Sequence, residues 1–303
     1  MAAFALIKVA ILLALSLPIV SGLTIYVLES HPGTTEQEAC SAADIKKIEE
    51  MVDSALKMAD ETVKALANPD VAKSSAFLSL FGSKAKPADI AAQHYTPILR
   101  VLKKPSPIRD LKSIGEHDLV FTCPVEKYEK KAAKVGGVYA STRNWDVAAK
   151  KLNLIRIMPL ALEADSTIDA VAKEFQAKKT FKEPVPLPFT LIHEAQHSTP
   201  IVGVHRVGDQ EVGGKKMYGL NQIRNILPED LKVKNAQNFA WFAMLAVSHS
   251  DLLTDDCKGS PAAISRDLSS QEGRLLKFKK RYAAVCKQWP SDDLAAKFKD
   301  EVE

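Results

Sequence analysis

Two histidines separated by three residues, His193 and His197, constrain the fold of this chain more than any other feature of its sequence. On a helix, residues four apart lie on one face, so both imidazole rings can bind the same metal ion. Glu194 follows the first histidine, and the other residues of the segment carry no charge. Pro188 and Pro200 bracket the segment, which predicts a short helix that can be buried between them.

The same spacing predicts metal-assisted hydrolysis. Glu194 lies one step round the helix, where its carboxylate can act as the general base on a metal-activated water. A catalytic zinc ion needs a third protein ligand and keeps one position for water. Asp209, twelve residues after His197, is the first choice for that ligand, and His205 and Glu211 are the alternatives. The sequence therefore predicts one zinc ion per chain.

The N-terminus has the order of a secretory signal peptide. Residues 1–22 contain a single charge, Lys8, followed by an apolar run and the small-residue sequence Val20-Ser-Gly22. We expect this segment to be removed and the mature protein to be extracellular, with no stable membrane association. Residues 23–303 are then expected to form a single domain.

The cysteines are interpreted in the light of secretion. The chain has 4 cysteines and no Cys-x-x-Cys pair, which favours two disulfides in an oxidising compartment. Three pairings are open. One of them, Cys40 with Cys123 and Cys257 with Cys286, would close two loops on either side of the middle of the chain.

Composition excludes several classes of protein. The chain is 46% hydrophobic and 26% charged over 303 residues, which is ordinary for a globular protein and excludes a disordered or polytopic membrane protein. The net charge of +4 is spread along the chain without a phosphate-binding loop or interleaved aromatic residues. No nucleic-acid partner is expected, and the basic run at 277–282 is interpreted as a solvated helix face.

Apolar periodicity and turn residues predict the order of the elements. Ser41, with Asp44 three residues on, is placed to cap a long amphipathic helix that reaches Leu66. Pro97 is expected to kink or interrupt a later helix. The remaining elements are helices over 76–81, 90–103, 166–177, 189–197, 236–249 and 268–286, strands over 118–122, 137–142 and 154–160, and a glycine-rich loop over 202–218.

Several of these segments together resemble the deuterolysin and peptidyl-Lys metallopeptidases, the aspzincin family. The likeness rests on the helix led by Cys40, the helix of His193 to His197, the sequence Tyr218-Gly-Leu-Asn, and the segment Asn235 to Ala243. It implies a zincin-like fold and a third zinc ligand that is an aspartate. It also implies that Tyr218 stabilises the oxyanion of the transition state, and that the chain is a divergent, secreted member.

The sequence departs from the family pattern at the third ligand. Lys215 stands three residues before Tyr218, where the family has its aspartate, and Asp209 stands nine residues before it. Either an insertion, turned by Gly213-Gly214, still delivers Asp209 to the metal, or the site has lost its third ligand. Met158 and Gln237 are further departures, from a cysteine and an aspartate.

The expected architecture is α+β: a helical N-terminal part, a small antiparallel or mixed sheet, and the metal-binding helix packed beneath it. The helical and sheet part extends to about residue 187, and C-terminal helices follow the metal-binding helix. The first hypothesis for function is a secreted zinc endopeptidase acting on polypeptides. The alternative is a catalytically impaired, aspzincin-like secreted protein that binds metal or a host partner, and a third hypothesis is an interaction protein without metal.

Overall fold

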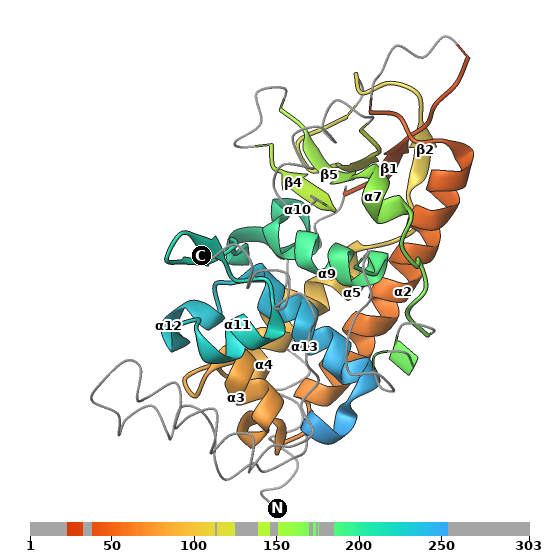
Figure 1. The fold of residues 1–303 in the computed structure, drawn as a ribbon. Coiled ribbons are helices and arrows are strands. Elements are labelled where there is room, and N and C mark those ends of the chain that lie inside the picture. Colours follow the sequence, from red (N-terminus) through yellow and green to blue (C-terminus); the bar gives the residue numbers. More distant parts are fainter. Residues whose placement is uncertain are drawn as a thin grey trace, which may run out of the picture.

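The computed structural model describes residues 23–32, 38–112, 114–124, 139–145, 151–169, 172–173, 175 and 185–253. A small sheet lies at one end of the molecule, and most of the helices lie below it (Figure 1). The strands are β1 (Ile25–Leu28), β2 (Ser106–Ile108), β3 (Leu119–Thr122), β4 (Ala140–Arg143), β5 (Asn153–Ile157), β6 (Glu211–Val212) and β7 (Lys215–Lys216). The α-helices are α2 (Ala42–Leu66), α3 (Ser75–Phe81), α4 (Pro87–Ile90), α5 (Thr96–Val101), α7 (Pro159–Leu162), α9 (Leu187–His197), α10 (Thr199–Val202), α11 (Leu220–Asn225), α12 (Glu229–Lys232) and α13 (Ala236–Ser248). Shorter helical turns are η1 (Val71–Lys73), η2 (Ala91–Tyr95), η3 (Gly203–His205) and η4 (Ser250–Leu253).

The main sheet is mixed, one of the two forms that the sequence predicted. Its strand order is β2-β1-β3-β5-β4, and only the β4–β5 pair is antiparallel. Every residue of β3 and β5 is buried, as expected for strands covered on both faces. Thr142 of β4 pairs with Ile155 of β5, whose side chain belongs to the large core beneath the sheet. Residues that are paired across two strands point to the same face of the sheet, so Thr142 also points toward the helices.

Helix α2 begins where the capping residues predicted. The Ser41 hydroxyl accepts a hydrogen bond from the Asp44 amide at 3.2 Å, and the Asp44 carboxylate accepts one from the Ser41 amide at 3.1 Å. A disulfide joins Cys40, just before this helix, to Cys123, just after β3. One of the two disulfides in the pairing considered above is therefore formed, and it links the start of α2 to the sheet.

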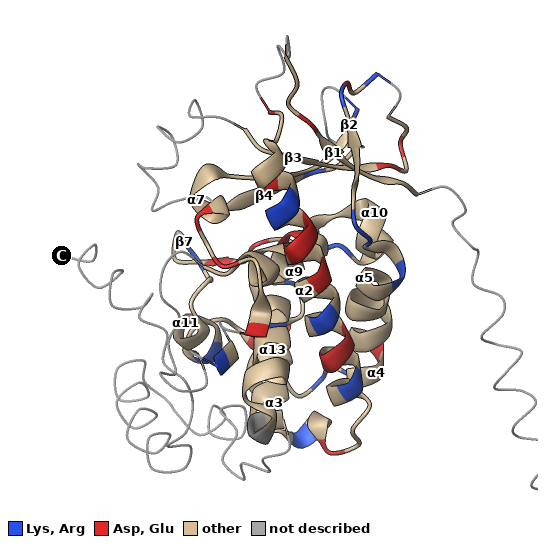
Figure 2. Ribbon diagram, turned by 90° about the vertical axis from the view of Figure 1, so that its right-hand side faces the viewer, with Lys and Arg blue, Asp and Glu red and all other residues tan. Residues whose placement is uncertain are grey.

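Helix α9 lies inside the molecule. All of its residues except the last, His197, are buried, and it packs against α2, α13 and the edge strand β4. In contrast, α2 carries alternating acidic and basic residues along its outer side (Figure 2). The predicted metal-binding helix therefore sits in a low-dielectric interior, between the amphipathic helix α2 and the buried, largely apolar helix α13.

The predicted α+β architecture is confirmed, and several details differ. No element was predicted at β1, β2, α11 or α12, and the hairpin of β6 and β7 was expected to be a loop. The strand predicted over 154–160 ends at Ile157, because Pro159 begins α7. Near Pro97 the helix changes to a π-helical turn at η2 instead of breaking. No helix in the described part of the chain is long and apolar enough to span a membrane.

Some predictions lie outside the described residues. These are the signal peptide at 1–22, the cysteines Cys257 and Cys286, the helix over 268–286 and the basic run at 277–282. Most of the helix predicted over 166–177 lies outside them as well.

Candidate metal centre

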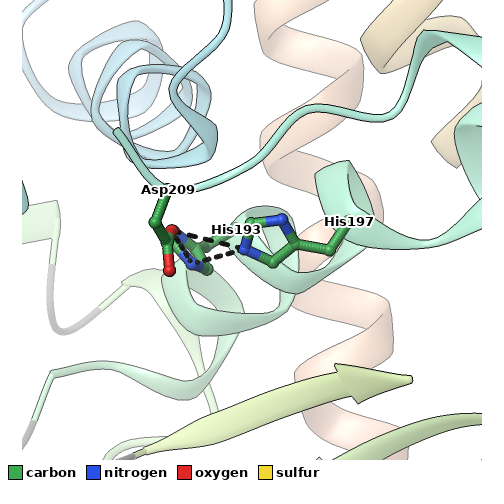
Figure 3. Close-up of side chains that lie close together, drawn as sticks. All are labelled: His193, His197 and Asp209. Atoms are coloured by element: carbon green, nitrogen blue, oxygen red, sulfur yellow. Dashed lines mark hydrogen bonds and ion pairs between the residues drawn. The ribbon is translucent and has the colours of Figure 1, made fainter. Parts of the chain in front are cut away.

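Three side chains converge at the C-terminal end of α9. The Nε2 atoms of His193 and His197 lie 3.1 Å apart, as expected for one helix face. Asp209 arrives from the segment after η3, and its Oδ1 atom lies 3.3 Å from Nε2 of His193 and 3.4 Å from Nε2 of His197. Figure 3 shows the two rings and the carboxylate pointing at one another. Among the described residues, these three form the one group of His, Cys, Asp or Glu side chains arranged to hold a metal ion.

The triangle has the dimensions of a zinc site. Two ligand atoms bound at 2.0–2.1 Å to a tetrahedral zinc ion lie about 3.3 Å apart. The three observed separations are 3.1, 3.3 and 3.4 Å, so these three atoms could together hold one zinc ion. The Oδ1 atom of Asp209 is buried and accepts no hydrogen bond from the described residues, as expected for an oxygen reserved for a cation.

The second nitrogen of one histidine is held by the backbone. Nδ1 of His197 lies 2.7 Å from the carbonyl oxygen of Val207. A carbonyl can only accept, so Nδ1 carries the hydrogen and Nε2 is the atom left for a metal. Nδ1 of His193 is buried, and the described part of the chain offers it no partner. The two imidazoles are therefore held differently: His197 has a backbone hydrogen bond, whereas the ring of His193 lies against the rings of His197 and Tyr218.

The second oxygen of Asp209 binds two further residues. Its Oδ2 atom accepts a hydrogen bond from the Tyr218 hydroxyl at 2.8 Å and lies 3.0 Å from Nζ of Lys216. This arrangement turns Oδ1 toward the imidazoles and leaves it as the carboxylate oxygen that could bind a metal ion. The indole nitrogen of Trp241 donates to the backbone carbonyl of Tyr218 at 2.9 Å, which ties that residue to α13.

Charges at the site are strongly coupled in the metal-free protein. Burial alone would raise the pKa of the Asp209 carboxyl, but its contacts with the two imidazoles outweigh burial and hold the pKa well below its usual range. Burial also opposes the charged form of His197, yet Asp209 and the charge of Glu194 raise its pKa above the ordinary value. Burial and the Asp209 charge raise the pKa of the Tyr218 hydroxyl, which therefore remains a donor. A bound divalent cation would replace the protons that this cluster attracts.

Glu194 is buried beside the triangle and is held by the sheet. Its Oε2 atom accepts a hydrogen bond from the Thr142 hydroxyl of β4 at 2.7 Å. Asn144, two residues further on, donates to the carbonyl oxygen of His197 at 2.9 Å and accepts from the Thr199 amide at 2.7 Å. The edge of the sheet therefore fixes both the carboxylate and the end of α9.

The structure chooses among the residues that the sequence proposed. It brings His193, His197 and Asp209 together, and it places Glu194 next to them. The alternatives His205 and Glu211 are exposed and lie outside the triangle, with the His205 ring near the ring of His94 instead. Lys215, at the family's aspartate position, is exposed on the hairpin.

The sequence analysis did not find Thr142, Val207 or Lys216. None of them stands at a fixed spacing from the histidines, so no local pattern marks them as part of the site.

Comparison with known proteins adds one structural likeness. No protein-family model matches the sequence, and no curated protein matches it. Among solved structures, the chain is similar to a zinc peptidase from Grifola frondosa, with 17% identity over 68% of this chain and 97% of that chain, and a TM-score of 0.43.

Proposed function

We propose that this chain is a secreted, zinc-dependent endopeptidase, a divergent relative of the aspzincins. The observation that carries the proposal is the triangle of His193, His197 and Asp209, whose ligand atoms have zinc-site separations, with a buried glutamate beside it. A zinc ion bound there supplies Lewis acidity that activates a water molecule and polarises a carbonyl group. A water-derived nucleophile and a general base together support hydrolysis of peptide bonds.

The residues of the chain have separate roles in this proposal. Glu194 accepts the proton of the attacking water and passes it to the leaving amine. Thr142 holds the Glu194 carboxylate through its hydroxyl. Tyr218, which remains protonated, is the candidate donor to the developing oxyanion, and it would have to leave Asp209 to serve in that way.

The position of β4 supports a polypeptide substrate. In the described part of the sheet, β4 is an end strand that pairs with β5 on one side only. An extended peptide can add to such an edge through backbone hydrogen bonds. Since Thr142 of the same strand contacts Glu194, a peptide bound along β4 would pass close to the general base.

A second candidate function follows from the contacts of Asp209. Its Oδ2 atom engages both Tyr218 and Lys216, so in this arrangement the tyrosine is not free to meet a substrate. A secreted protein that binds zinc without hydrolysing peptides has the same ligands and would show this arrangement permanently.

One experiment tests both candidates. Purified protein without a metal-affinity tag is analysed for zinc and incubated with a peptide library, in parallel with Glu194→Gln and with Glu211→Gln as the matched control on an exposed glutamate. We expect one zinc per chain in all three proteins and chelator-sensitive cleavage by the parent and the control. Glu194→Gln should cleave about 10²–10⁴-fold more slowly, the usual contribution of a general base. Zinc without any cleavage would favour the second candidate, and absence of zinc would refute both.

A further inference from the structure

The segment that carries Asp209 has little core of its own. Residues 208–216, which include the hairpin of β6 and β7, are all exposed or only partly buried. Gly213 and Gly214 turn this hairpin with φ values of 61° and 78°, which suit glycine. The segment is therefore held mainly by polar contacts: Tyr218 and Lys216 bind the Asp209 carboxylate, and the backbone on either side of Asp209 needs an anchoring interaction of its own.

Asn235 supplies that interaction from the start of α13. Its side chain is fully buried. The Oδ1 atom accepts a hydrogen bond from the Gln210 amide at 3.0 Å, next to Asp209, and Nδ2 donates to the Met217 carbonyl at 2.9 Å. The two contacts lie at opposite ends of the hairpin.

Neighbouring contacts strengthen the attachment. Nδ2 of Asn235 also donates to Oδ1 of Asn238 at 2.7 Å, and Asn238 is anchored in turn to the Leu80 carbonyl at 2.6 Å. The Ala236 amide donates to the Gly208 carbonyl at 3.0 Å, just before Asp209. The buried amide of Asn235, which Asn238 holds in place, therefore binds both ends of the segment that contains Asp209.

We infer that Asn235 is a positioning residue of the metal centre, which holds Asp209 against the two histidines by clamping residues 208–217 to α13. The inference rests on the proposed function in so far as Asp209 is a zinc ligand. Only an amide serves here, because the position needs one acceptor for Gln210 and donors for Met217 and Asn238. An aspartate of the same shape would set its oxygen against the Met217 carbonyl and release that end of the hairpin.

Zinc affinity is the quantity that separates positioning from general stability. Loss of a residue that orients a metal ligand typically weakens binding about 10- to 100-fold. The test uses Asn235→Asp and measures zinc affinity by competition with a chelating indicator, starting from zinc-free folded protein. We expect the zinc affinity of Asn235→Asp to be lower than that of the parent by a factor in this range.

Asn153 provides a matched control. It is buried, its Oδ1 atom accepts from the Trp145 amide at 2.7 Å, and its Nδ2 atom donates to the carbonyls of Glu116 at 2.7 Å and Asp118 at 3.0 Å. Asn153→Asp therefore breaks a similar set of hydrogen bonds in the loops of the sheet. It should lower the unfolding temperature and leave zinc affinity at the parent value.

Hydrogen exchange gives a readout that needs no metal. In zinc-free protein, Asn235→Asp should speed amide exchange in residues 208–218, and Asn153→Asp should not. Should Asn235→Asp fail to fold, Asn235→Ala removes the acceptor and the amide donors without adding a buried charge, and the same two effects are expected of it.

The outcomes are distinct. Parent-like zinc affinity in a folded Asn235 variant, or equal losses in the Asn235 and Asn153 variants, would overturn the inference and leave the proposed function standing. If the parent binds no zinc, the proposed function fails, and unchanged exchange in residues 208–218 would overturn the clamp as well.

Discussion

Acid should destabilise this protein through one buried histidine outside the metal centre. His94 lies in the π-helical turn η2 and is 5% exposed. Its ring stacks on Phe239 with centroids 4.1 Å apart, and its Nδ1 atom lies 2.8 Å from Oε1 of Gln196, the residue before His197. Burial, with a smaller contribution from the nearby charge of His205, lowers the pKa of His94 from 6.5 to about 4, although the Gln196 hydrogen bond opposes the shift.

The sign of the effect follows from proton counting. Between pH 6.5 and about 4, the unfolded chain protonates His94 and the folded chain does not. Acid therefore favours the unfolded state, and the stability attached to this group is present above pH 6.5 and is lost as the pH falls. For this pair of pKa values, the free energy of unfolding drops by about 2 kcal/mol between about pH 8 and pH 5 and by about 3 kcal/mol at about pH 4.

The assay compares the parent with His94→Gln, whose amide can still donate to Gln196 but does not titrate. Urea unfolding is measured at several pH values in the presence of a chelator, so that metal release does not contribute. The variant will be less stable at neutral pH because it loses the stacking on Phe239. On acidification to about pH 5, the parent should lose about 2 kcal/mol more than the variant. Parallel stability curves for the two proteins would refute the reasoning, because the other titrating groups cancel in the comparison.

Two further predictions concern the metal centre. Asp209→Ala removes the proposed third zinc ligand. The binding free energy of structural zinc sites is about 10–16 kcal/mol in total, so the loss of one ligand should lower zinc affinity about 10²-fold or more. Indicator competition measures the affinity, with Glu211→Ala as the control, and an unchanged affinity would exclude Asp209 as a ligand. Thr142→Val removes the hydroxyl that holds Glu194, and a hydrogen bond to a charged group contributes about 1.5–3 kcal/mol, so kcat/KM for a peptide should fall about 10- to 100-fold with zinc content unchanged. Thr142→Ser should restore the rate, and a valine variant as fast as the parent would show that the carboxylate needs no such support.

Local patterns allowed the sequence to predict the elements that depend on neighbouring residues. The spacing of His193 and His197 puts both rings on one helix face in any fold that keeps the helix. The start of α2 was predicted correctly because a capping box involves residues only three apart. The α+β class followed from apolar periodicities that differ between helices and strands.

Strands β1 and β2 and the hairpin of β6 and β7 were missed because all of them are short, and β1 and β2 also depend on partners far along the chain. β1 is stabilised by pairing with β2 and β3, whose residues follow it by about eighty positions or more. Two-residue strands, as in the hairpin, carry too few side chains for an alternating pattern.

By itself, the sequence determined that His193 and His197 lie on one face of a helix with Glu194 beside them, because helical geometry relates residues that are close along the chain. It left Asp209, His205 and Glu211 open as the third ligand, since the path of a glycine-rich segment has no fixed period. The tertiary structure brings Asp209 to the two histidines, and Asn235 accepts a hydrogen bond at one end of that segment and donates one at the other. It also brought Thr142 and Lys216 to the site, since contacts between distant segments depend on how the helices and the sheet pack together.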